Sequence, residues 1–387
     1  MITLYKKIEK SKSNLRGIVE LKKEDEPLLH PTMICLSAQS SYPKSVFGII
    51  REGMRAARLR TSQSISGSYA LSDFPINFVG LTYDYQGDGF GDSLAQDYFL
   101  PLISKDGKRI DTKQAKKNMR NITFMTYCNG TLTYFDFENK LISMMQELGY
   151  SNAEIKSIIK ELAVVSVLTM QDTSKCLATS FQLVDVNDPE IYEEATPSLI
   201  DGLAKQNTNH DFIQTGNNNG IYYFNGSGKH SIKAFFEDDY LPHAMISAIV
   251  SQCLTRSIDK HHEFSFDNMQ EMIQSIINHH NVGYTPDEIM KDLDEQIDYP
   301  GARKLTSYEC EYLDIIDELS KKANNFENDN RLLRQANERQ RENYDKLENA
   351  IRSTVSEIDY IRIFRQIGYQ FSSEDLKKLE DFVQAKK

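Results

Sequence analysis

The chain has 387 residues, of which 40% are hydrophobic and 26% are charged, a composition typical of a soluble globular protein. Acidic residues outnumber basic ones by 56 to 45, and the formal net charge of −11 argues against a protein that binds nucleic acid. No stretch has the apolar length of a signal peptide or transmembrane segment, and five scattered cysteines indicate no disulfide framework, so we expect a cytoplasmic protein.

From about residue 31 the sequence alternates between predicted strands and predicted helices. Such strands, apolar on both faces, predict an α/β fold with a mainly parallel sheet covered by helices on both faces. Short apolar runs predict strands at 32–38, 76–83, 122–127, 164–170, 180–186 and 231–236, and helical spacing of apolar residues predicts helices at 45–60, 111–121, 137–149, 151–162 and 244–254.

The composition changes after residue 255, which predicts four parts of the chain. They are an N-terminal segment (1–30), the α/β domain (31–255), a helical linker region (256–305) and a C-terminal helical extension (306–387). In the extension, apolar residues recur at heptad spacing, which fits a coiled coil, a long helical hairpin or a helix packed along its own domain. One heptad position holds Ile316, Ala323, Asn330, Asn337, Tyr344, Ile351 and Ile358, and the other holds Leu319, Phe326, Leu333, Gln340, Leu347, Thr354 and Ile361.

Polar and nucleophilic side chains follow the predicted strands. Ligands of parallel sheets bind beyond the carboxyl ends of the strands, so these residues are the candidates for chemistry. They are the glycine-rich stretch "DYQGDGFGDS" (84–93), the sequence Thr126-Tyr127-Cys128-Asn129-Gly130, Asp188 in "NDPEI", and His243 directly before the last predicted helix.

These motifs resemble the α/β-hydrolase superfamily over about residues 31–255. That family carries its nucleophile on a strand-to-helix turn written G-x-S-x-G, and its chain order is nucleophile, acid, histidine. Cys128 takes the nucleophile position and Gly130 the second glycine, whereas Thr126 replaces the first glycine. The glycine-rich stretch is similar to a D-x-R-G-x-G-x-S loop that many members carry, with Gln86 in place of arginine.

The resemblance implies a triad of Cys128 as nucleophile, His243 as base and Asp188 as the acid that orients it. Oxyanion donors would be the backbone N–H of Asn129 and one from the loop at Ala38 or Gln39. His230 is the alternative base and Asp185 the alternative acid. The simpler interpretation of Cys128 is a small buried hydrophobic residue in a strand.

Two functions follow from these alternatives. The first is a thiol hydrolase or acyltransferase that acts on an ester, thioester or amide and uses no cofactor or metal. The second is an inactive hydrolase-like scaffold that binds a partner protein, or self-associates, through its C-terminal helices; the β-branched Thr126 favours this one. The Asn- and Lys-rich composition, the missing tryptophan and the charged tail are similar to those of secreted bacterial effectors, which implies delivery into a host cell.

Overall fold

A computed structural model describes residues 3–7, 18–22, 27–37, 43–60, 67–71, 74–82, 90–204, 210–214, 218–237 and 240–354, together with Ser372 and Lys377. The chain divides into two compact units, Met1–Asp314 and Ile315–Lys387. We describe each unit by itself.

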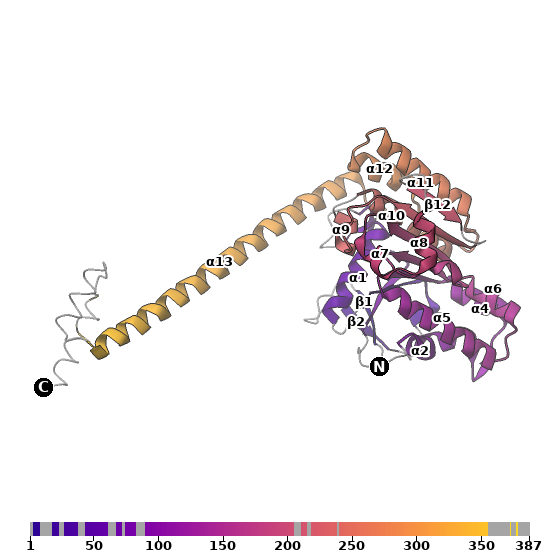
Figure 1. Cartoon of the computed structure of the whole chain (residues 1–387), viewed down its shortest axis with the longest axis horizontal. Helices are drawn as coiled ribbons and strands as arrows, with labels where there is room; N and C mark the ends of the chain where they lie inside the picture. The colour runs from indigo at the N-terminus through magenta and orange to yellow at the C-terminus, as the bar shows by residue number, and fades with distance from the viewer. Residues whose placement is uncertain are drawn as a thin grey trace. The chain divides into compact units, whose positions relative to one another are not determined.

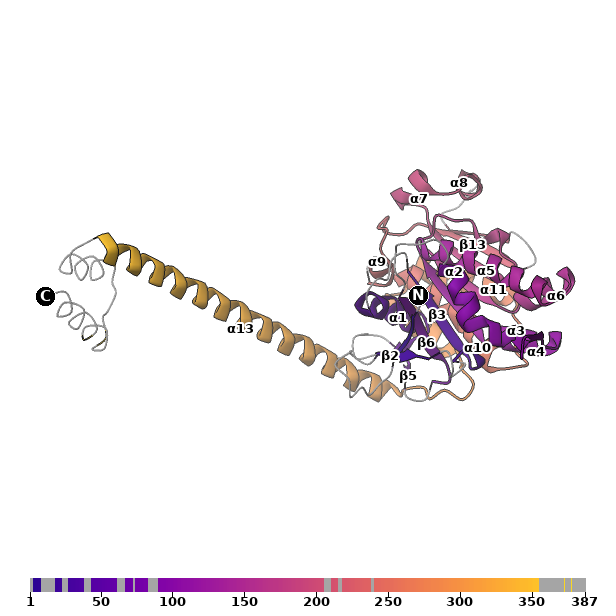
Figure 2. The same ribbon diagram turned by 90° about the horizontal axis from the view of Figure 1, so that it is seen from below.

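In the described residues of the first unit, nine strands form one sheet in the order β12-β13-β11-β10-β9-β3-β6-β1-β2 (Figures 1 and 2). The strands from β13 to β6 pair in parallel, which confirms the prediction of a mainly parallel sheet. The outer pairs, β12 on β13, β1 on β6 and β1 on β2, are antiparallel. The strands are β1 (Thr3–Lys7), β2 (Ile18–Leu21), β3 (Thr32–Leu36), β6 (Asn77–Thr82), β9 (Ile122–Tyr127), β10 (Ala163–Val167), β11 (Thr179–Asp185), β12 (His210–Gln214) and β13 (Asn219–Phe224).

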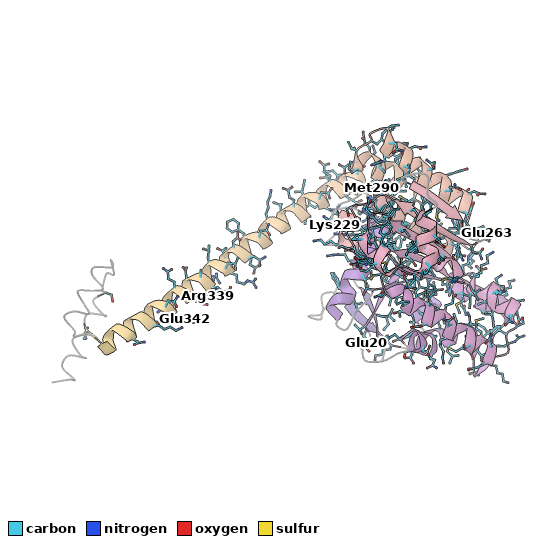
Figure 3. All side chains as sticks on the ribbon, in the orientation of Figure 1. Glu20, Lys229, Glu263, Met290, Arg339 and Glu342 are labelled. Carbon is cyan, nitrogen blue, oxygen red and sulfur yellow. The ribbon has the colours of Figure 1, made fainter. Side chains whose placement is uncertain are left out.

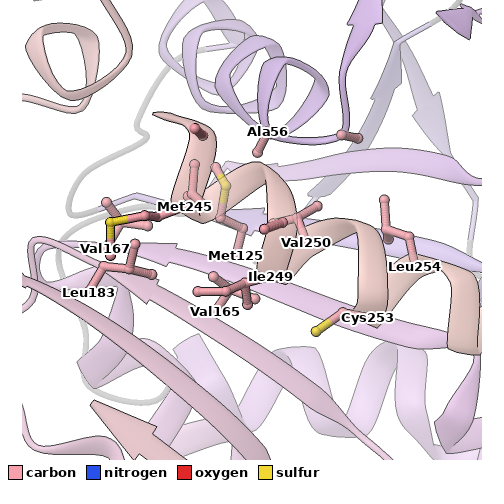
Figure 4. Packing of buried hydrophobic residues seen from close by; sticks show 14 of the residues in the cluster. Ala56, Met125, Val165, Val167, Leu183, Met245, Ile249, Val250, Cys253 and Leu254 are labelled. Carbon is pink, nitrogen blue, oxygen red and sulfur yellow. The ribbon is translucent and has the colours of Figure 1, made fainter. Parts of the chain in front are cut away.

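Helices cover both faces of this sheet, because side chains along each buried strand alternate between two hydrophobic clusters. In β9, Phe124 packs with helices α2 to α6, and the next residue, Met125, packs with α1 and α10 on the opposite face. Figure 4 shows the second of these clusters, in which Ile249 of α10 lies beside the sheet residue Val165. The described helices that lie wholly in the first unit are η2 (Pro27–Leu29), α1 (Pro43–Ala56), α2 (Phe90–Leu94), η4 (Ala95–Phe99), α3 (Leu100–Ile103), α4 (Thr112–Arg120), α5 (Gly130–Glu147), α6 (Asn152–Ile159), η5 (Thr173–Lys175), α7 (Pro189–Glu194), α8 (Pro197–Ala204), α9 (Ile232–Glu237), α10 (Tyr240–Ile258), α11 (Phe266–Asn281) and α12 (Pro286–Gln296).

The predicted strand at 231–236 is wrong, because this segment forms helix α9. A short apolar run such as "IKAFF" cannot be assigned to helix or strand from its pattern alone. In the fold, the buried Phe235 and Phe236 join the core on the α10 side of the sheet, and the last parallel strand is β13. The residues that follow the last parallel strand are therefore 225–231, which include His230.

Residues 256–305, predicted as a helical linker region, contribute α11 and α12 to the first unit. Buried apolar residues of both helices belong to the same core cluster as α10. Polar contacts also join this region to the start of the domain: Arg58 donates to both carboxylate oxygens of Asp294, at 2.8 and 2.6 Å, and the Tyr69 hydroxyl donates to the Ile297 carbonyl at 2.7 Å. The region is thus part of the domain core.

Helix α13 (Ser307–Thr354) begins at the end of the first unit and continues into the second. It forms one continuous helix through the described part of the heptad region. None of the helices in the described residues is apolar over enough of its length to cross a membrane.

Candidate functional site

A strained turn between β9 and α5 holds Cys128. The backbone φ of Cys128 is +52°, in the left-handed region that a residue with a side chain seldom adopts. Strand β9 ends one residue earlier, at Tyr127, and α5 begins two residues later, at Gly130. Such strain costs about 1–3 kcal/mol and is found mainly at functional sites. The turn leaves the Cys128 side chain partly exposed beyond the end of the strand.

Gly130 is required at this turn because the loop after β3 passes against it. A Cβ atom at this position would lie 2.6 Å from the carbonyl oxygen of Leu36 and 3.2 Å from the backbone nitrogen of Ser37. Carbon atoms do not approach backbone atoms this closely, so a larger residue would displace the loop or the turn. The glycine therefore allows the backbone after β3 to lie beside the residues that follow Cys128.

Thr126, at the position of the missing first glycine, is accommodated by hydrogen bonds. Its hydroxyl lies 2.8 Å from the Thr131 hydroxyl and donates to the Ser166 hydroxyl, also at 2.8 Å. All three residues are fully buried. The Thr126 side chain thus links β9 to α5 and β10 and stabilises the turn through these buried hydrogen bonds. The turn therefore forms despite the bulk of a threonine at this position.

His230 lies next to Asp188, which follows β11. Nδ1 of His230 is 2.6 Å from Oδ2 of Asp188, a distance typical of a charge-assisted hydrogen bond. Asp188 is fully buried and is the N-cap of α7, where its Oδ1 accepts the backbone N–H of Glu190 at 3.1 Å. The cap fixes the carboxylate, and the carboxylate fixes the imidazole ring.

The second ring nitrogen of His230, Nε2, lies near the carboxylate of Glu190, and the Cys128 thiol interacts with the same imidazole. Nε2 forms no hydrogen bond of normal geometry and lies 3.5 Å from Oε2 of Glu190. Burial lowers the pKa of His230, but hydrogen bonding and charge interactions with Asp188 and Cys128 outweigh burial and raise that pKa from 6.5 to about 10. The imidazole is therefore cationic at neutral pH.

Tyr127, the residue before Cys128, supports His230 from the other side. The two rings stack with their centroids 5.8 Å apart, and the Tyr127 hydroxyl donates to the His230 carbonyl at 3.2 Å. Burial, followed by the charge of the neighbouring Cys128, raises the pKa of Tyr127 to about 12, so its hydroxyl remains a donor at neutral pH.

Asp185, the alternative acid, holds the loop that carries His230. Its Oδ1 accepts the backbone N–H groups of Asn187 and Gly226, at 2.9 and 2.8 Å, and its Oδ2 accepts that of Gly228 at 2.9 Å. Gly228 has a φ of +71°, which the turn requires. Asp185 is thus occupied by backbone groups, and Asp188 is the carboxylate that contacts the imidazole.

His243, predicted as the base, lies elsewhere in the fold. It is in the first turn of α10, buried, with its ring 5.0 Å from the Phe236 ring in an edge-on arrangement. Burial, with the nearby charges of Arg58 and Arg55, lowers its pKa to about 3. The structure therefore brings His230, not His243, to Asp188 and Cys128, because 231–236 is a helix and the loop after β13 supplies the histidine.

The expected oxyanion donors are only partly described. Asn129 has helical backbone angles and directly precedes α5, so its N–H lies at a helix N-terminus, where the peptide dipoles favour negative charge. Ala38, Gln39 and residues 84–89 of the glycine-rich stretch lie outside the described residues. Farther along that stretch, Gly91 packs against the backbone of Asp136 and Phe137.

The sequence gives little indication of what several residues around the thiol do. Tyr127 reads as the end of a strand, Glu190 as an exposed helix residue, and Asp185 as the weaker of two acids. Their roles depend on contacts with the 225–231 loop, which lies about 40 residues after Asp185 and Glu190 and about 100 residues after Tyr127. In the described residues, His, Cys, Asp and Glu side chains form no group of three or more that could hold a metal ion.

Chemically, the arrangement joins a thiol, an imidazole and a buried carboxylate in one contact series at the carboxyl ends of β9, β11 and β13. Comparison with known proteins finds no family model and no curated protein that matches this chain.

Proposed function

We propose that this protein is a thiol-dependent, α/β-hydrolase-like enzyme that hydrolyses an ester, thioester or amide, or transfers its acyl group. The observation that carries this proposal is the left-handed Cys128 on a strand-to-helix turn, beside a histidine that Asp188 holds at 2.6 Å. Nucleophile, acid and histidine occur in the order 128, 188 and 230, which is the chain order of that superfamily.

In the proposed reaction the proton of the Cys128 thiol resides on His230. The raised pKa of His230 favours the imidazolium, and Asp188 stabilises this cation through Nδ1. The thiolate attacks the carbonyl carbon, a carbon–sulfur bond forms, and the carbonyl π electrons move to oxygen. Thiolates attack well at neutral pH, so the cationic histidine serves here mainly as the acid for the next step.

The oxyanion then collapses, and the bond from carbon to the leaving group breaks. His230 donates its Nε2 proton to the leaving alcohol, thiol or amine, and an acyl-thioester on Cys128 remains. In the second half, His230 takes a proton from water or from an acceptor molecule, which attacks the thioester and releases the thiolate. The N–H of Asn129, at the start of α5, is the proposed donor to both oxyanions.

Alkylation of the native protein with iodoacetamide tests the site without a known substrate. Burial raises the pKa of the Cys35, Cys176 and Cys253 thiols, that of Cys253 to about 12, so these three should react slowly in the folded protein. Cys310 is partly exposed with a raised pKa and serves as an internal control in the same molecule. We expect Cys128 to be labelled fastest at pH 7, as measured by mass spectrometry of its peptide.

Two substitutions make this test specific. His230→Ala should slow the labelling of Cys128 and leave that of Cys310 unchanged, whereas His243→Gln should change neither. A set of activated acyl esters and thioesters would then give the turnover rate. Equal labelling of Cys128 in the wild-type and His230→Ala proteins would contradict the proposed pair.

A second function, a scaffold without catalysis, is favoured by one contact. Oε2 of Glu190 lies 3.5 Å from Nε2 of His230, so the imidazolium can pair with two carboxylates and leave the thiol inactive. On this alternative, Cys128→Ala would leave binding to a partner protein unchanged, and Cys128 would react no faster than Cys310. The same alkylation experiment therefore distinguishes the two functions.

A further inference from the structure

Helix α13 exposes a row of large apolar side chains. The exposed fractions of Leu319, Phe326 and Leu333 are 59%, 73% and 61%. These residues repeat every seven positions and so occupy one face of the helix. Long helices in proteins owe most of their stability to packing of an apolar face, which indicates that α13 has a partner.

A second row of residues, three positions before each residue of the first row, forms the other half of a heptad repeat, and two of its members are polar. In the register that places the first row at position d, position a holds Ile316, Ala323, Asn330 and Asn337. An asparagine at position a pairs with the same asparagine across a parallel two-stranded coiled coil, and it fixes register at a cost in stability. Two such asparagines favour a partner with asparagines at the same positions, as a second copy of this chain has.

The charges that flank the seam agree with this partner. Position g holds Lys322 and Asp329, and position e of the following heptads holds Glu327 and Arg334. In a parallel, in-register pair, g of one helix faces e of the next heptad on the other helix, so Lys322 faces Glu327 and Asp329 faces Arg334. Each pair is repeated by symmetry, which gives four attractive contacts.

Displaced registers do not have this complementarity. In a pair displaced by one heptad, Lys322 lies opposite Arg334 and Glu327 opposite Asp329, so these two contacts are repulsive and only Asp329 opposite Arg341 is attractive. The charged side chains project from α13, as Arg339 and Glu342 illustrate in Figure 3. Within one chain, Lys322 contacts Glu318 at 2.7 Å, but both side chains are well exposed, and such a pair rearranges at little cost.

We propose that two copies of this chain associate through α13 as a parallel, in-register, two-stranded coiled coil with Asn330 and Asn337 paired across its seam. This inference is independent of the proposed function, because none of its residues belongs to the site around Cys128.

Charge reversal in the full-length chain tests the proposal. Lys322→Glu with Asp329→Arg, and separately Glu327→Lys with Arg334→Asp, turn all four contacts of the homodimer repulsive. Mixing the two variants restores every contact in a heterodimer. By analytical ultracentrifugation, we expect each variant alone to raise the dimer dissociation constant at least about tenfold, and the equimolar mixture to recover the wild-type value.

Disulfide crosslinking tests the orientation in a Cys128→Ala, Cys310→Ser background. Leu319→Cys, at position d near one end of the seam, should crosslink readily in a parallel pair, because the two Cα atoms then lie within disulfide range. Glu318→Cys, on the outer face, is the matched control and should crosslink far more slowly. A wild-type chain that sediments as a monomer, charge variants that dimerise as the wild type does, or a Leu319→Cys chain that fails to crosslink would each overturn the proposal.

Discussion

The substitution Asp188→Asn isolates the electrostatic role of the buried carboxylate. Asparagine has nearly the same shape and retains an oxygen that can accept the Glu190 N–H, so the cap of α7 should persist. What is lost is the negative charge 2.6 Å from Nδ1 of His230. The variant therefore changes the charge that holds the imidazolium with little change in packing.

The size of the effect follows from the pKa of His230, which is raised from 6.5 to about 10. At 1.36 kcal/mol for each unit, the shift corresponds to about 5 kcal/mol of preference for the cation. Cys128 supplies part of this preference, so we assign about 2–3 kcal/mol of it to Asp188. A loss of this size lowers the pKa of His230 by about two units, so in Asp188→Asn the imidazolium, and the Cys128 labelling that depends on it, should be lost at a lower pH than in the wild type.

The assay is the rate of iodoacetamide labelling of Cys128 relative to Cys310 between pH 5 and pH 10. Asp172→Asn is the matched control, because Asp172 likewise caps a short helix and accepts the backbone N–H of Ser174 at 2.8 Å. Its labelling profile should match that of the wild type. An Asp188→Asn protein with unchanged thermal unfolding and wild-type labelling of Cys128 would refute the electrostatic role of Asp188.

Three further predictions concern the turn, the loop and pH. Gly130→Ala should destabilise the fold by about 1–3 kcal/mol and slow Cys128 labelling, since the added Cβ would lie 2.6 Å from the Leu36 oxygen. The control in denaturant unfolding is Gly48→Ala in α1, where an added Cβ would have no neighbouring atom within 4 Å. Asp185→Ala should lower both the melting temperature and the Cys128 labelling rate, because three backbone N–H groups lose their acceptor. A labelling rate that is retained in Asp185→Asn but lost in Asp185→Ala would support the positioning role of Asp185. Because the pKa of His230 is higher in the folded chain than the 6.5 of an unfolded one, its stabilisation is complete below pH 6.5 and is lost as pH rises to about 10. The difference in unfolding free energy between wild type and His230→Gln should shrink over that range, and a constant difference would contradict the raised pKa.

Local patterns in the sequence were sufficient to locate Cys128 and Asp188. Each directly follows a short, strongly apolar run, and "ITFMTY" and "SFQLVDV" coincide closely with β9 and β11. Ser151 and Glu154 form a capping box at the start of α6, a feature that depends only on residues three apart in the chain. Features that depend on near neighbours could thus be read without coordinates.

The histidine depended on the tertiary structure. "NGIYYF" and "IKAFF" are both short apolar runs, and only the first can pair in parallel with β11 while the second packs as a helix against the core. Because the last parallel strand is β13 and not 231–236, the loop that follows it contains His230 and does not contain His243. Asp185 then fixes this loop through backbone N–H groups from residues 226 and 228, contacts that no local pattern contains.

Taken by itself, the sequence determined the α/β class and placed Cys128 and Asp188 just beyond two strands, because each of these follows from the periodicity and the ends of single elements. Only the tertiary structure decided which histidine meets the acid, and that the helices of residues 256–305 belong to the core. The physical reason is that these features arise from contacts between segments far apart in the chain. The free energy of such contacts depends on packing and on backbone hydrogen bonds, and backbone groups are the same in every residue, so no local sequence pattern reveals them.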